Sequence, residues 1–205
     1  MKNKLVVFVI AILLLISILF ISVSVDNASK QKQIRKAMVN NSFAEFITIS
    51  RNLEDLLNNI ENEITSCEAN QQILITLSCN FTALNTTLKW YDNVFPVKGS
   101  SRSSYTGISD FEHIAYTFTT TAGVVNNFGY SGIMMDGTIS ENEVKYMSIL
   151  KSDIDIIIQS MVSDENPLQE SQNLSPSQID NILDTFLSKW SYYNENSPYF
   201  LLQSN

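Results

Sequence analysis

Apolar residues recur at helical spacing along most of this chain, and the pattern changes character near residues 26 and 96. Residues 5–25 are apolar without a charge, and the following 70 residues alternate apolar and polar positions with a period close to 3.5. No Gly or Pro occurs before Pro96. The sequence therefore predicts an all-α fold: an N-terminal transmembrane helix followed by a helical bundle of about four to five helices.

The strongest periodic signal is a heptad seam between residues 46 and 95. Apolar side chains recur every seven residues, at Phe46, Leu53, Ile60, Cys67, Leu74, Phe81, Leu88 and Phe95. The paired position three residues further on holds Ile49, Leu56, Leu77, Leu84 and Tyr91. Two structures fit the seam, a single long first helix or a helical hairpin that turns near SCEAN, residues 66–70. We favour the hairpin, because the later helices are too short to cover one long seam.

The seam has two interpretations. It is either the core of a helical bundle, which we favour, or the contact face of a coiled-coil dimer or of a partner helix. The flanking positions show no regular alternation of charge, and this weakens the dimer interpretation.

Beyond residue 95 the predicted helices are shorter. A Ser- and Gly-rich loop is expected at 96–110, followed by the remainder of the bundle at 111–197 and an apolar C-terminal tail at 198–205. Within the remainder, helices are expected to start at residue 111, at 141 and after Ser175. We expect the apolar tail to pack back onto the bundle, with a docking role as the alternative. The N-terminal part divides into a tail at 1–4, the anchor at 5–25 and the long helix or hairpin at 26–95.

The apolar segment has the length of a membrane span. Its 21 residues would cover about 31 Å as a helix at about 1.5 Å per residue, close to the thickness of the bilayer hydrocarbon. A secretory signal usually has a shorter apolar core, so we favour an uncleaved single-pass anchor over a removed signal.

Charge is distributed unevenly around that segment. Four basic residues follow it closely, Lys30, Lys32, Arg35 and Lys36, and only two precede it. The positive-inside rule then favours a cytoplasmic C-terminal domain, whereas the Ser-, Thr- and Asn-rich composition suits an exported one. We favour the cytoplasmic side. From residue 37 onward there are 20 acidic and seven basic residues, and this excess of negative charge argues against nucleic-acid binding.

The chain contains two cysteines, Cys67 and Cys79, and a single histidine, His113. This inventory matches no zinc pattern. A disulfide between Cys67 and Cys79 is a weak hypothesis: the cysteines would flank the turn of a hairpin, but would lie about 18 Å apart on one straight helix.

One short stretch resembles half of a calcium-binding loop. In DGTISENE, residues 136–143, Asp136, Ser140 and Glu143 stand where an EF-hand has ligands, but the first two ligand positions fall on Gly132 and Met134. A capping box explains the same letters, with Ser140 as the N-cap and Glu143 three residues later. We favour the cap and treat the three residues as weak metal candidates.

No catalytic signature is visible. His113 stands alone, and its sequence neighbour Glu112 projects about 100° away on a helix. The carboxylates of Asp153 and Asp155 fall on different helix faces and are expected to be solvated. We found none of the common phosphate-binding, metalloprotease or serine-hydrolase motifs. The sequence thus predicts a protein that is not an enzyme and requires no cofactor.

These observations lead to two functional hypotheses. The first is a non-enzymatic interaction or scaffold module at a membrane, whose partners are the lipid bilayer and a protein partner or a second copy bound through helices. The second is a small-ligand sensor that works with a separate output partner. A C-terminal aromatic group, Trp190, Tyr192, Tyr193, Tyr199 and Phe200, could bind a partner or belong to the core.

Overall fold

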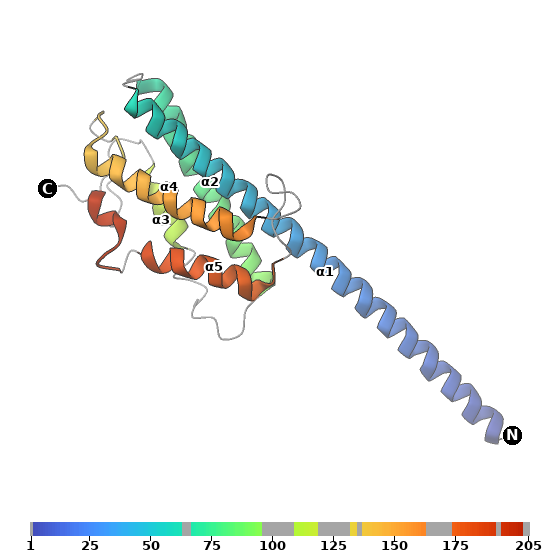
Figure 1. The fold of residues 1–205 in the computed structure, drawn as a ribbon. Helices are drawn as coiled ribbons and strands as arrows, with labels where there is room; N and C mark the ends of the chain where they lie inside the picture. The colour runs from blue at the N-terminus through green and yellow to red at the C-terminus, as the bar shows by residue number, and fades with distance from the viewer. Residues whose placement is uncertain are drawn as a thin grey trace. The chain divides into compact units, whose positions relative to one another are not determined.

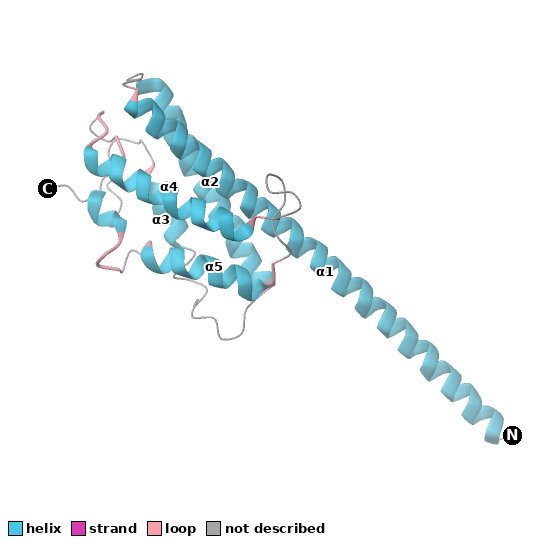
Figure 2. Cartoon of the chain, in the orientation of Figure 1, coloured by secondary structure: helices cyan, strands magenta, loops and turns pink. Residues whose placement is uncertain are grey.

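The computed structural model describes residues 2–62, 67–95, 109–118, 132–134, 137–162, 174–191 and 194–202; within these ranges the side chains of residues 2–16, 18, 19, 67 and 109 are not described. The elements are α1 (Lys2–Glu61), α2 (Cys67–Val94), α3 (Ser109–Thr117), α4 (Glu141–Met161), α5 (Pro176–Lys189) and the 3-10 helix η1 (Pro198–Leu202), shown in Figure 1. Helices and the loops that join them account for the described chain (Figure 2). The all-α prediction is confirmed for this part.

The chain forms two compact units, Met1–Ala37 and Met38–Asn205, and their boundary falls within α1. Among the side chains that the structure describes, no helix combines the length and hydropathy that a bilayer crossing requires. The expected anchor at 5–25 falls mainly on residues outside that description, and it stays a prediction.

The second unit begins with an antiparallel helical hairpin. The Asn59 amide donates to the Asn70 side-chain oxygen (3.1 Å) beside the turn. At the other end, Val39 and Tyr91 line the same small cavity. The paired parts of α1 and α2 are therefore antiparallel, as Figure 1 also shows. The structure has the hairpin and not a single helix that continues to residue 95.

The heptad seam is the interior of this unit. Its described members are buried except for Ile60 and Phe95, which are partly buried against the same core. The interpretation of the seam as a coiled-coil dimer face is wrong, because α3, α4 and α5 of the same chain provide the side chains that cover it. An apolar seam that is already desolvated has no surface left to offer a second copy.

Aromatic rings join the hairpin to the remaining helices. Phe111 of α3 lies at ring-centroid distances of 6.0 Å from Phe46, 6.5 Å from Phe81 and 5.2 Å from Phe186. Phe186 in turn lies 5.7 Å from Trp190. These separations are within the range of favourable aromatic contacts, so one ring on α3 links α1, α2 and α5.

The apolar C-terminal tail packs back onto the bundle, as expected. Pro198, Tyr199 and Leu202 of η1 are buried, and the Tyr199 hydroxyl donates to the Asp110 backbone carbonyl (3.2 Å). Residues 203–205 lie outside the described part. Pro198, Tyr199 and Leu202 are therefore part of the core, whereas Phe200 of the same tail is exposed.

Candidate interaction surface

An open groove lies between α2 and α3 and encloses about 660 Å³. On each helix, the residues that line the groove recur at spacings of three and four, so they form one stripe along the helix. The α2 stripe consists of Ser78, Thr82, Asn85, Thr86, Lys89, Trp90 and Asn93, and the α3 stripe of Glu112, Ala115 and Tyr116. We call this feature the α2/α3 groove.

Two aromatic side chains in the groove are exposed. Trp90 is 65% exposed and Tyr116 is 41% exposed, whereas Trp190 of the core is completely buried. Val94, one helical turn after Trp90, is 40% exposed. Exposed rings of this size that cluster beside polar side chains are typical of contact surfaces in soluble proteins.

The charged groups of the groove balance one another. The Lys89 ammonium contacts a Glu112 carboxylate oxygen (3.2 Å), and the Tyr116 hydroxyl donates to the other oxygen (3.2 Å). The hydrogen bond from Lys89 lowers the pKa of Glu112, and the bond from Tyr116 adds to this effect. Partial burial, followed by the nearby Glu112 charge, raises the pKa of Tyr116. At neutral pH the groove therefore carries one closed ion pair and a neutral phenol.

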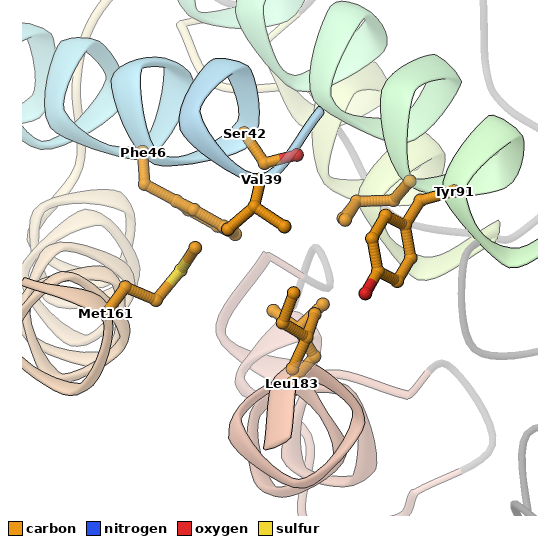
Figure 3. A pocket seen from close by; sticks show the side chains of 8 residues that line it. Val39, Ser42, Phe46, Tyr91, Met161 and Leu183 are labelled. Atoms are coloured by element: carbon orange, nitrogen blue, oxygen red, sulfur yellow. The ribbon is translucent and has the colours of Figure 1, made fainter. Parts of the chain in front are cut away.

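A space inside the bundle, by contrast, is small. It lies between α1, α2, α4 and α5, and Figure 3 shows Val39, Phe46, Tyr91, Met161 and Leu183 around it. Its volume is about 10 Å³. That is room for about one water molecule and not for an organic ligand.

The calcium-like stretch forms a helix cap. The Ser140 hydroxyl accepts from the Glu143 backbone N–H (3.3 Å), and the Glu143 carboxylate accepts from the Ser140 backbone N–H, which completes the capping box of α4. The second carboxylate oxygen accepts from the Met134 backbone N–H (2.8 Å). Both oxygens that a calcium loop would use at its last position are therefore engaged by the backbone. Asp136 lies outside the described residues, and no group of three potential metal ligands occurs within them.

Ser140→Ala is expected to lower the free energy of unfolding by about 1 kcal/mol, since it leaves an N–H at the start of α4 without its acceptor. Ser148→Ala on the same helix is the matched control. The Ser148 hydroxyl bonds only to the Val144 carbonyl one turn earlier, so this change is expected to be neutral or slightly stabilising. Thermal melting of both variants, with and without calcium, checks the assignment. A calcium-induced rise in Tm that Glu143→Gln abolishes would show that the loop binds the ion.

The structure does not bring the two cysteines together. Cys67 begins α2 and Cys79 lies 12 residues later on the same helix, a separation of about 18 Å along the axis. Cys79 is a free, exposed thiol. The hypothesis of a disulfide within the chain is therefore wrong, because the hairpin turn ends before Cys67 and does not separate the two residues.

His113 lies beside the carboxylate of Asp110 on α3. Its Nδ1 lies 3.7 Å from Asp110, one turn earlier on α3, and both side chains are largely buried. Glu112 instead faces the groove. The helical spacing of three residues, and not adjacency in sequence, decides which carboxylate the imidazole meets.

Two further sequence expectations are corrected. Asp153 is not solvated: its carboxylate accepts from the Trp190 indole N–H (2.8 Å) and pairs with Lys189 (2.7 Å). Asp155 accepts from the Ser50 hydroxyl and from Lys151.

In the C-terminal aromatic group, Trp190 and Tyr199 belong to the core, Phe200 is exposed, and residues 192 and 193 lie outside the description.

No family model matches the chain, and no curated protein or solved structure matches it.

The sequence contained one overlooked signal for the groove. Trp90 falls between the seam positions Leu88 and Tyr91, where the heptad pattern calls for a polar residue. A tryptophan at an outward-facing position is the kind of residue that marks a contact surface. The position of Tyr116 beside it could not be seen, because it depends on how α3 packs against α2.

Proposed function

We propose that this protein is a single-pass, membrane-anchored helical module without enzymatic activity, which binds a partner protein through the α2/α3 groove. The observation that carries the proposal is the contrast between a core cavity of about 10 Å³ and an open surface groove of about 660 Å³ with two exposed rings. An open groove with exposed aromatic side chains is suited to contacts with another macromolecule.

The anchor is supported by uncovered apolar side chains. Phe20, Ile21, Val23 and Val25 on α1 are each more than half exposed, and they point to several sides of the helix. A helix that is apolar on all sides is stable in hydrocarbon and unfavourable in water. With the basic residues that follow, this arrangement favours a cytoplasmic bundle.

The net charge of the chain indicates which kind of partner it would attract. Because the chain from residue 37 onward is strongly acidic, a second copy would be repelled, whereas a partner with basic side chains would be attracted. The groove itself is balanced by the pair of Lys89 and Glu112. We therefore expect the occupant to be a polypeptide segment that places apolar side chains on Trp90 and Tyr116 and has basic residues on either side.

The groove also bears on the sensor hypothesis. A small-molecule site usually encloses most of its ligand, and the α2/α3 groove is open. The enclosed space in the bundle is too small for such a ligand. The structure of the described residues thus favours the interaction module over the sensor.

Site-directed photocrosslinking tests this proposal. A photoreactive amino acid replaces Thr86, an exposed residue that lines the groove, in the full chain in its native membrane. We expect a covalent adduct with one partner protein, attached within a segment that contains both apolar and basic residues. Trp90→Ala is expected to reduce the adduct at least about tenfold, as truncation of a central aromatic contact does.

The matched control places the same photoreactive residue at Ser152, which is exposed on α4. It is expected to give no such adduct. An adduct that persists in Trp90→Ala would exclude the groove as the binding surface. An adduct between two copies of this chain would replace the proposed partner by self-association.

A further inference from the structure

A basic stripe follows the predicted anchor on α1. Lys32 and Lys36 are exposed and Arg35 is partly exposed. Their spacings of three and four residues place them within a sector of about 100° on one side of the helix. We call these three residues the basic stripe.

Lys30 belongs to a different side of α1. Its ammonium contacts the Asp26 carboxylate (2.7 Å), and both side chains are well exposed. Lys30 lies about 160° from Lys32 around the helix axis. Lys30 and Asp26 thus form a pair of zero net charge, whereas the stripe consists of three basic side chains on another side of the helix.

The distance between the stripe and the apolar segment matches a membrane surface. At about 1.5 Å per residue, Lys32 lies about 10 Å beyond Val25 along the helix axis, and Lys36 lies about 16 Å beyond Val25. Side chains on a helix lean toward its N-terminus, so long basic side chains reach back toward the apolar segment. The headgroup layer extends roughly 5–7 Å beyond the hydrocarbon, and electrostatic attraction acts over a further 8 Å or so at physiological salt.

We propose that the basic stripe binds the headgroups of anionic phospholipids in the bilayer that holds the anchor. Each Lys or Arg near such a surface contributes about 1 kcal/mol of attraction. Three residues on one side of a helix would therefore gather anionic lipid around the protein. This inference rests on the proposed anchor, and the experiment separates the two.

The test measures which lipids surround the protein. The full chain, with Cys67→Ser and Cys79→Ser, receives a donor dye at Gln33→Cys and is reconstituted in vesicles of phosphatidylcholine and phosphatidylserine. Trace phosphatidylserine or phosphatidylcholine carries the same acceptor dye on its acyl chain. We expect severalfold more energy transfer to labelled phosphatidylserine than to labelled phosphatidylcholine, and we expect high salt to abolish the difference.

Two variants assign the effect to its source. Lys32→Gln/Arg35→Gln/Lys36→Gln is expected to equalise transfer to the two lipids. Asp26→Asn/Lys30→Gln removes a pair without changing the net charge and is expected to retain the preference. Equal transfer to both lipids in the unaltered chain, or an unchanged preference in the triple variant, would overturn the proposal. The proposal would also be overturned if both variants lost the preference for phosphatidylserine to the same extent.

The anchor has its own readout. Resistance to alkaline extraction from vesicles of pure phosphatidylcholine reports insertion, because neutral lipid does not attract the stripe. If the chain is extracted there, the anchor is wrong, and the stripe is judged by co-sedimentation. Salt-sensitive binding to phosphatidylserine vesicles that the triple variant lacks would still support it, whereas equal binding by both chains would refute it.

Discussion

Phe111→Ala is expected to lower the free energy of unfolding of the bundle by about 3–5 kcal/mol, the usual cost of removing a buried phenylalanine ring. Phe111 is completely buried and contacts the rings of Phe46, Phe81 and Phe186. These rings come from α1, α2 and α5. The cavity left by the alanine would therefore lie where several helices meet, and none of them could close it without moving away from another neighbour.

Chemical denaturation of the full chain in mild detergent, followed by tryptophan fluorescence, measures this loss. The buried Trp190 indole reports the bundle, since it lies 5.3 Å from the Tyr146 ring and 5.7 Å from the Phe186 ring. Phe200→Ala is the matched control, because Phe200 on η1 is 45% exposed, and it is expected to cost less than about 1 kcal/mol. Similar losses in the two variants would show that Phe111 does not hold the helices together.

Cys79 is expected to remain unlabelled when intact cells that produce the full chain are treated with a membrane-impermeant thiol reagent. It is expected to react fully once the membrane is permeabilised. The basic residues that follow the apolar segment favour a cytoplasmic bundle, so the membrane would shield the thiol. The thiol is free and exposed, so burial or a disulfide would not account for an absence of labelling.

Two variants make the labelling specific. Cys67→Ser leaves Cys79 as the only thiol and is expected to behave as the unaltered chain does. Cys79→Ser measures whatever signal Cys67 contributes. Labelling of Cys79 before permeabilisation would place the bundle on the outer side and would contradict the positive-inside prediction.

The hairpin was predictable because its signal is local and repeated. Every described residue of the heptad seam, from Phe46 to Phe95, is buried or partly buried. The start of α4 was predictable for the same reason, since Ser140 and Glu143 form a capping box within a few residues of chain. Such patterns depend on helix geometry alone, so a sequence contains all the information they require.

Side-chain partners between helices were not predictable in this way. Asp153 looked solvated from its own helix, yet it accepts a hydrogen bond from Trp190, 37 residues later in the chain. Glu112 likewise pairs with Lys89 of α2, 23 residues earlier in the chain, and its position within α3 does not reveal this contact. Each of these pairs depends on the rotation of one helix against another.

The sequence by itself determined an all-helical chain, the buried seam, the cap of α4 and the uneven distribution of charge, because spacing along one helix decides each of them. Only the tertiary structure decided that α2 begins at Cys67 and that Trp90 and Tyr116 share an open groove. The physical reason is that a groove exists only between two packed helices. The groove residues lie between Ser78 and Asn93 on α2 and between Glu112 and Tyr116 on α3. Within each helix their spacing is that of ordinary polar surface positions, and they form a groove only because α3 packs against α2.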